Sequence, residues 1–406
     1  MLTCDEAVRI ILRTVNPLAP VECVLDDALG RVLAEPVAAR WDLPPADNSA
    51  MDGFAFAFSG QGSGEELALT GFIPAGSWME GPVPPGMAVR IMTGAPLPAG
   101  CDTVAPLEEV TELTDGIRLQ RAPQVGQHIR LRGEELRRDE IVLHSGTPLF
   151  AAELGLLAAA GAERVWVHPA PRVALLSTGD ELVELGQAPG PGQIVNSNAH
   201  LLAARLREEG CAVFSLGIAG DTPAELAACL RRGLEADLLI STGGVSAGDR
   251  DYVQAVLHDL GFTLGFWKVA VKPGKPVLFG TVEDRPVFGL PGNPAASAAT
   301  FELFVRPALR RLAGHADPLH PRLRAVLSAP ISGGEKRQRF LWGTLEAEAG
   351  RYVFNPSPRQ NSGQNRAMQG ARALLPVPGG SDDIRAGREV EVLLLRMPPG
   401  HPLPLL

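Results

Sequence analysis

The stretch RVALLSTGDEL at residues 172–182 predicts a buried strand that runs into a polar, glycine-containing loop. Helix-like and strand-like segments alternate after it. They are a helix near 199–209, a strand at 212–216, a helix at about 223–235 that Asp221 or Thr222 can cap, an apolar strand at 238–240 and a helix near 250–260. This alternation predicts a doubly wound α/β domain over residues 171–315.

The segments outside this domain are rich in turn residues. Glycine and proline account for 45 and 36 of the 406 residues, so tight turns must be abundant. Short apolar runs between these turns predict a β-rich domain over 41–147 and a small β domain over 320–400. The predicted fold class is therefore α/β plus β, in several domains.

The first residues are expected to form a helical, linking domain together with a later segment. Thr3 and Glu6 form a capping box before an apolar helical pattern, and a second helical piece is expected at 25–33. Another helical pattern, at 149–160, stops at Gly161. We therefore expect residues 1–40 and 148–170 to form one domain.

Charge and composition exclude several classes of function. The formal net charge of −9 provides no overall positive field for nucleic acid or anionic lipid. The longest apolar stretch is too short for a membrane helix, and Asp5 and Glu6 stand where a secretory signal carries basic residues. A soluble, cytoplasmic protein is expected. Five scattered cysteines argue against a disulfide framework or a zinc site, so a catalytic metal would be a hard, oxygen-bound cation.

Three loops of the α/β domain have the composition of an anion site. They lie at 177–182, 241–251 and 290–294, where strands end and helices begin. Small residues there let a phosphate approach the backbone, and acids nearby could hold a cation. The candidate binding residues are Gly179, Asp180, Gly243, Gly244, Pro291, Gly292, Asn293 and Pro294. Each loop alone could be an ordinary tight turn, but three in one domain favour a phosphate-bearing ligand.

A cluster of lysines follows at 268–276, KVAVKPGKP. Even spacing places Lys268 and Lys272 on one face of a predicted strand, with Lys275 in the adjoining turn. In a chain of negative net charge this predicts a local anion site, although a solvated strand end remains an equal alternative. The turn-rich segments 44–54 and 90–98 also carry polar groups, and on residues alone turn chemistry is the favoured interpretation of both.

Taken together, these segments resemble the molybdopterin molybdenumtransferase family, which includes bacterial MoeA proteins and the E domain of gephyrin. The motifs that carry the resemblance are PPADNSAMDGFA at 44–55, RIMTGAPLP at 90–98, STGDEL at 177–182, GGVSAGDRDY at 243–252, KPGKP at 272–276 and LPGNP at 290–294. The resemblance covers nearly the whole chain. The α/β motifs alone are less specific, because related nucleotide-handling proteins share that domain.

The resemblance implies a homodimer whose active cleft lies between the α/β domain of one subunit and β domains of the other. It implies cleavage of adenylylated molybdopterin with release of AMP, and transfer of molybdenum from molybdate to the dithiolene. Magnesium as cofactor, and transient contact with a molybdopterin adenylyltransferase and apo-molybdoenzymes, are further implications.

The resemblance also assigns residues to this reaction. Asp221 and Asp251, with Asp249 as an alternative, would hold magnesium. Lys272, Lys275 and Lys268 would hold molybdate, helped by Ser246, Arg337 and Ser362. Glu181 would lie near the pterin or the reacting sulfurs, and Asp52, Thr93 and Arg130 would bring polar groups from the second domain.

The sequence departs from the family pattern at three positions. Glu135 replaces the usual aspartate of a Gly-Glu-Asp motif, Asn196 replaces an aspartate, and Ala296 stands where serine is common, with Ser297 beside it. Two other functions remain alternatives: a non-enzymatic scaffold or cofactor carrier, and a nucleotide-handling enzyme such as the adenylyltransferase.

Overall fold

The structure is a computed structural model that describes residues 1–220, 222–244, 252–348 and 350–397. Two compact units make up the chain. The α/β unit comprises Met1–Val21, Gly30–Val32 and the chain from His168 onward, and the β-rich unit comprises Glu22–Leu29 and Leu33–Val167. The domain boundaries expected from sequence stay predictions.

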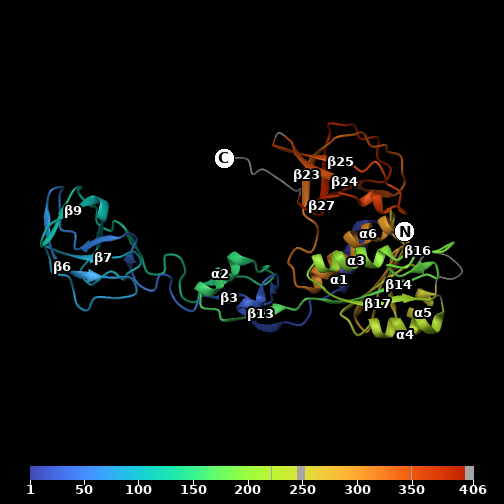
Figure 1. Ribbon diagram of the computed structural model, residues 1–406, viewed down its shortest axis with the longest axis horizontal. Coiled ribbons are helices and arrows are strands. Elements are labelled where there is room, and N and C mark those ends of the chain that lie inside the picture. The colour runs from blue at the N-terminus through green and yellow to red at the C-terminus, as the bar shows by residue number, and fades with distance from the viewer. Residues whose placement is uncertain (221, 245–251, 349, 398–406) are drawn as a thin grey trace. The chain divides into compact units, whose positions relative to one another are not determined.

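A six-stranded sheet forms the centre of the α/β unit, in the order β17-β14-β18-β22-β21-β19 (Figure 1). The four strands from β17 to β22 are parallel, and β21 and β19 run antiparallel at one edge. Their bounds are β14 Arg172–Thr178, β17 Ala212–Ala219, β18 Leu238–Thr242, β19 Thr263–Trp267, β21 Leu278–Val282 and β22 Arg285–Leu290. The parallel strands place their carboxyl ends at one edge, as the α/β prediction requires.

Helices cover both faces of this sheet because successive residues of a strand point to opposite sides. Val173 and Leu175 of β14 pack into one core with α1, α3, α6 and α7, whereas Ala174 and Leu176 pack into another with α4 and α5 (Figure 1). The helices are α1 Cys4–Thr14, α3 Ser197–Glu208, α4 Pro223–Gly233, α5 Val253–Asp259, α6 Pro294–Thr300, the π-helical turn η3 Phe301–Val305 and α7 Arg306–Leu312. The doubly wound prediction is confirmed.

Local sequence explains where these helices begin. The Thr3 hydroxyl accepts a hydrogen bond from the Glu6 N–H, and the Glu6 carboxylate accepts one from the Thr3 N–H, which is the predicted capping box of α1. Thr222 caps α4 in the same way, with Pro223 at the first helical position. Ala7 and Ile11 then bury the apolar face of α1.

The C-terminal strands form a second six-stranded sheet in the order β20-β24-β25-β23-β27-β26. An additional pairing of β24 with β26 closes five of these strands into a ring around Leu341, Leu345 and Phe354. The bounds are β20 Val271–Lys272, β23 Arg322–Leu327, β24 Gln338–Glu348, β25 Arg351–Pro356, the 3-10 turn η4 Asn365–Met368, β26 Ala373–Val377 and β27 Glu389–Leu394. Because β20 comes from the lysine-rich segment, that segment is part of this sheet. A short parallel pair, β15 Leu182–Val183 with β16 Ile194–Val195, lies outside both sheets.

The β-rich unit is built on a six-stranded sheet in the order β8-β5-β7-β6-β10-β9. Its strands are β5 Gly53–Phe56, β6 Glu66–Ile73, β7 Met87–Ile91, β8 Thr103–Pro106, β9 Val110–Glu112 and β10 Gly116–Leu119, with the turn η2 Leu107–Glu109. Smaller pairings join β4 Asn48–Ser49 to β11 Ile129–Arg130, β3 Val37–Ala38 to β12 Ile141–Leu143, and β13 Arg164–His168 to both β1 Val21–Val24 and β2 Val32–Leu33. Helix α2, Ala151–Ala159, ends before Gly161 as predicted.

The helical piece expected at 25–33 is wrong. Leu25–Ala28 forms only the 3-10 turn η1, and Gly30 has a φ of 75°, which ends it. Val32 and Leu33 instead pair with β13 as strand β2, so pairing with a strand more than a hundred residues away overrides the local pattern. Among the described helices, none is long and apolar enough to cross a membrane.

Candidate functional site

The three loops expected to bind an anion follow neighbouring strands of the central sheet. Strands β14, β18 and β22 are adjacent, and the Gly243 N–H donates a hydrogen bond to the Leu290 carbonyl at 3.1 Å. A Cβ placed on Gly292 would lie 3.9 Å from the Gly243 Cα. The loops after β14, β18 and β22 are therefore close together at one edge of the sheet, where open α/β sheets bind ligands.

Glycine is required at two positions of this edge. Gly243 has a φ of 86°, and a Cβ there would lie 2.4 Å from the Thr178 carbonyl oxygen. Gly179 has a φ of 138°, and a Cβ there would lie 2.4 Å from a carboxylate oxygen of Glu181. The first contact lets the loops after β14 and β18 approach each other. The second shows that the Glu181 side chain folds back over its own loop.

Buried polar side chains hold the loops in place. The Ser177 hydroxyl donates to Asn196 Oδ1 at 3.1 Å, and the same oxygen accepts from the Ala199 N–H at 3.3 Å as the N-cap of α3. Asn198 Nδ2 donates to the Gly292 carbonyl at 2.8 Å. The side-chain oxygen of Asn196 therefore caps α3, and it does so without the charge that an aspartate would carry at this position.

The C-terminal domain brings Ser362 to the same edge. The Ala295 N–H, in the first turn of α6, donates to the Ser362 carbonyl at 2.9 Å, and Asn293 Nδ2 lies 3.5 Å from the Ser362 hydroxyl. Asn365 Nδ2 donates to the Ser197 hydroxyl at 3.3 Å. The loop around Ser362 thus contacts Asn293 and the first turn of α6, and also the first residue of α3.

The KPGKP loop also packs against α6. Gly274 has a φ of 110°, and a Cβ there would lie 2.4 Å from Thr300 Cγ2. Lys272 pairs with Arg339 in the register of β20 with β24, and Arg337 Nη1 donates to the Val271 carbonyl at 3.1 Å. The structure therefore brings Lys272 and Arg337 together, and both their loop and the Ser362 loop contact α6.

Lys272 is paired with a carboxylate that the sequence did not single out. Its Nζ lies 2.5 Å from Glu335 Oε1. The hydrogen bond from Lys272 and its charge lower the pKa of Glu335, so the carboxylate is ionised at neutral pH. Glu335 sits between two glycines and a run of bases, GGEKRQR at 333–339, and an isolated acid in a basic run is the signal that could have marked it.

The expectation that Lys268 and Lys272 share a strand face is wrong. Lys268 has a φ of 67°, and β20 contains only Val271 and Lys272, so the strand does not extend back to Lys268. Its Nζ lies 3.5 Å from the centre of the Trp267 ring, a cation–π contact. Lys275 is exposed in the loop, where its carbonyl accepts from the Val269 N–H at 3.1 Å.

Three of the predicted site residues lie in the β-rich unit. Both the N–H and the hydroxyl of Thr93 donate to Asp52 Oδ1, each at 2.7 Å. These bonds, the backbone one first, hold the pKa of Asp52 below its usual range. Arg130 pairs with Asn48 in β11 and β4, and the Gly94 N–H donates to the Ser49 carbonyl at 2.8 Å. Asp52, Thr93 and Arg130 therefore lie on neighbouring segments of one unit.

Several predicted residues lie outside the described part of the chain. They are Asp221, Ser246, Asp249 and Asp251, which include all the expected magnesium ligands. Among residues that the structure does describe, there is no group of three or more His, Cys, Asp or Glu side chains able to hold a metal. Asp180 is exposed, and its Oδ1 lies 3.9 Å from the position of a Cβ on Gly220, next to Asp221 in sequence.

Two other departures from the family pattern have simple structural settings. Ala296 is buried, and its carbonyl accepts from the Thr300 hydroxyl at 2.9 Å. The neighbouring Ser297 is fully buried as well. Glu135 is exposed, and its backbone N–H donates to the Leu43 carbonyl at 3.0 Å.

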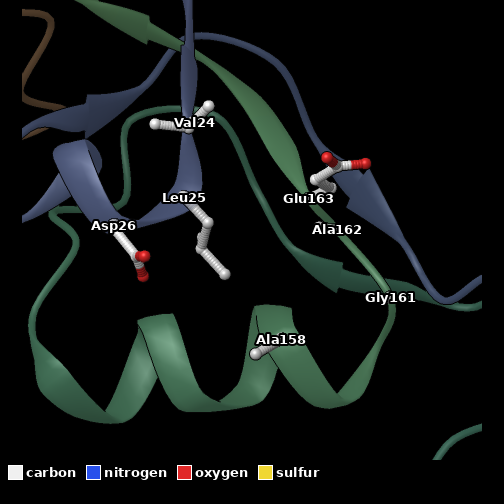
Figure 2. Close-up of a pocket in the computed structure, with 7 residues that line it drawn as sticks. All are labelled: Val24, Leu25, Asp26, Ala158, Gly161, Ala162 and Glu163. Carbon is white, nitrogen blue, oxygen red and sulfur yellow. The ribbon is translucent and has the colours of Figure 1, made fainter.

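A pocket of about 560 Å³ lies within the β-rich unit, away from these residues in sequence. Figure 2 shows it above helix α2, with Leu25 and Asp26 on one side and Ala162 and Glu163 on the strand side. It contains none of the predicted site residues. The loops described above are thus distinct from this pocket.

Comparison with known proteins agrees with this geometry. Three family models match: MoeA N-terminal region (domain I and II) at residues 2–161, probable molybdopterin binding domain at 174–311, and MoeA C-terminal region (domain IV) at 324–395. The chain is 38% identical over 381 residues to a molybdopterin molybdenumtransferase of Nostoc sp., covering 91% of this chain and 87% of that one.

Two further relatives extend this result. Molybdopterin molybdenumtransferase 2 of Mycobacterium tuberculosis is 36% identical over 403 residues, covering 97% of this chain and 99% of that one. The crystal structure of the molybdopterin biosynthesis moeA protein from Pyrococcus horikoshii superimposes with a TM-score of 0.84 at 28% identity, covering 97% of this chain and all of that one.

Fold and site together define a multidomain protein with a molybdopterin-binding type of α/β domain. Its α/β domain lies between N-terminal and C-terminal regions of the MoeA type. The chain belongs to the molybdopterin molybdenumtransferase (MoeA) family, which confirms the predicted family and fold class.

Proposed function

We propose that this protein transfers molybdenum from molybdate to adenylylated molybdopterin and releases AMP. The observation that carries the proposal is the convergence at helix α6. The loops after β14, β18 and β22 and the Ser362 contact lie at its start, and the KPGKP loop packs along its side. One element thus supports a glycine-rich edge suited to phosphate and a lysine loop suited to a second oxyanion.

The lysine loop would hold molybdate. Molybdate is a tetrahedral dianion, and Lys272, Lys275 and Arg337 provide cationic donors on the KPGKP loop and the neighbouring chain. Lys268 would have to leave its cation–π contact with Trp267 before it could bind molybdate. Glu181 would face the pterin or its sulfurs, since its carboxylate lies over the Gly179 turn.

Magnesium is part of the proposal as a cofactor that neutralises charge on the phosphoanhydride and its AMP leaving group. The donors assigned to it, Asp221, Asp251 and Asp249, are carboxylates, the ligand type that magnesium prefers. The Asp180 carboxylate lies 3.9 Å from the position of a Cβ on Gly220, the residue before Asp221 in the sequence. The loops after β14, β18 and β22 would position the phosphoanhydride, and the lysine loop would position the molybdate.

AMP release tests the proposal. Purified protein given molybdopterin-AMP, molybdate and magnesium should release AMP and yield active cofactor. Asp251→Asn should lose that release while the fold, followed by circular dichroism, is kept. Tight pterin binding without AMP release with any divalent metal would favour the scaffold alternative, and ATP-dependent adenylylation of molybdopterin would favour the nucleotide-handling enzyme.

We further propose that the protein acts as a homodimer in the cytoplasm. Asp52, Thr93 and Arg130 of one subunit and the lysine loop of the other would serve one reaction, as the family resemblance implies. Transient contact with a molybdopterin adenylyltransferase and with apo-molybdoenzymes would pass an unstable substrate and product between proteins. Family membership supports these proposals.

A further inference from the structure

Lys272 carries an internal counter-ion at the place proposed for the oxyanion. The ion pair joins Lys272 Nζ to Glu335 Oε1 at 2.5 Å, and the two side chains are 46% and 38% exposed. Solutes can therefore reach both partners. An ion pair this exposed contributes little to stability, so an anion in solution can compete for the ammonium group.

The pair lies in a patch of positive charge. Arg339 is opposite Lys272 in the register of β20 with β24, and its guanidinium donates to the Ser332 carbonyl. Arg337 donates to the Val271 carbonyl. Neither arginine forms an ion pair with a carboxylate among the described residues. Glu335 therefore places one negative charge beside the cations Lys272, Arg337 and Arg339, and the Asp383 carboxylate accepts from the Gly333 N–H two residues away.

We propose that Glu335 is an internal competitor for the oxyanion substrate: its carboxylate occupies Lys272 until molybdate displaces it. This inference rests on the proposed function, which places Lys272 at the molybdate. Exchange replaces a single negative charge with a dianion, so molybdate gains more from the surrounding cations than Glu335 loses. The freed carboxylate still repels the bound dianion. Glu335 thus sets the molybdate concentration at which the site fills.

Direct binding measures this competition. Glu335→Gln removes the charge and keeps the shape, and isothermal titration with molybdate, and with tungstate, gives the dissociation constant. We expect about two- to fivefold tighter binding, the scale of one exposed ion pair. The matched control is Glu389→Gln, which removes an exposed carboxylate paired with Arg324 in the same C-terminal sheet. It should leave the dissociation constant unchanged.

Kinetics separate competition from a structural role. In the AMP-release assay, Glu335→Gln should lower the KM for molybdate by the same factor, with kcat and the KM for molybdopterin-AMP unchanged. In a Lys272→Met background the Glu335→Gln effect should shrink, because only the repulsion between the carboxylate and the bound dianion remains. Unchanged or weaker molybdate binding by Glu335→Gln, or an effect of undiminished size without Lys272, would overturn the inference.

The titration with molybdate also distinguishes failure of this inference from failure of the proposed function. If the wild type binds molybdate and Glu335→Gln binds it more tightly, the competition stands even if no AMP is released, and only the proposed reaction fails. If AMP is released normally but Glu335→Gln changes neither constant for molybdate, the reaction stands and the competition fails.

Discussion

Glu302 is a buried carboxylate in the π-helical turn between α6 and α7. Arg205 donates to both of its oxygens, at 2.7 and 3.0 Å, and His320 Nε2 lies 3.0 Å from Oε2. Glu302→Gln should lower the free energy of unfolding of the α/β unit by about 1–3 kcal/mol, because it removes the buried carboxylate that pairs with Arg205 and leaves that guanidinium only its pairs with Glu208 and Glu209. Urea unfolding followed by tryptophan fluorescence measures this. Glu391→Gln, which breaks the exposed pair with Arg322, should cost less than about 1 kcal/mol.

The same residue predicts a pH dependence of stability. Burial alone would raise the pKa of Glu302, but the hydrogen bond from His320 and the charge of Arg205 outweigh it and lower the pKa below its ordinary value of 4.5. The stabilisation is therefore complete above that value and is lost as the pH falls through the lower folded-state pKa. Between the two values the wild type should lose stability more steeply than Glu302→Gln. Parallel curves would contradict the assignment.

Asp52 and Thr93 make a second prediction at this scale. Thr93→Ser keeps the hydroxyl that donates to Asp52 and should keep activity, whereas Thr93→Val leaves only the backbone donor. Asp52→Ala should reduce kcat/KM for AMP release by about a hundredfold, the scale of losing one group that acts in the transition state. Equal activity of Thr93→Ser and Thr93→Val would show that the hydroxyl does not position Asp52.

Among elements, the KPGKP loop depends on its contact with α6. Gly274→Ala would place a methyl group 2.4 Å from Thr300 Cγ2 and should cost about 1–3 kcal/mol in stability. It should also weaken molybdate binding, because the loop moves away from the helix. Gly261→Ala is the control: its φ of 82° is also positive, so alanine is strained there too, but nothing lies within 4 Å of its Cβ. Unchanged molybdate affinity in Gly274→Ala would separate the loop from the site.

Elements that depend on local chemistry could be predicted from sequence. Helix α1 has its Thr3–Glu6 box, α4 has Thr222 and Pro223, and α2 stops before Gly161. Elements that depend on distant partners could not. Strand β2 exists because it pairs with β13. Lys268 is not part of a strand, because its φ is 67°, and its ammonium group contacts the Trp267 ring.

The candidate site shows the same division. Consecutive strand ends of an α/β sheet meet by rule, so the loops after β14, β18 and β22 could be placed together from sequence. The contact of Lys272 with Glu335 joins segments that are 63 residues apart, and it follows from the pairing of β20 with β24. No local pattern indicates that pairing. Ser362 was assigned through resemblance alone, and its contact with Asn293 gives that assignment a physical basis.

At the scale of the whole molecule, the proposed homodimer predicts complementation. Asp52→Ala and Lys275→Ala should each lose nearly all AMP release alone. If residues from two subunits serve one reaction, mixed dimers of the two variants contain one site with both native residues. Unfolding and refolding the mixture should restore up to about a quarter of wild-type AMP release, the share expected from random pairing into dimers. No recovery in a mixture shown to form mixed dimers would contradict a shared site.

The central claim is that the lysine loop and the sheet edge hold two different oxyanions beside α6. A crystal structure with AMP and tungstate tests it most directly, because the tungsten atom gives an unambiguous anomalous peak. We predict that peak within about 4 Å of Lys275 Nζ or Lys272 Nζ, at hydrogen-bonding distance through its oxygens, with AMP phosphate at the loops after β14 and β18. Tungstate on an unrelated surface, with Lys272 still paired to Glu335, would contradict the account.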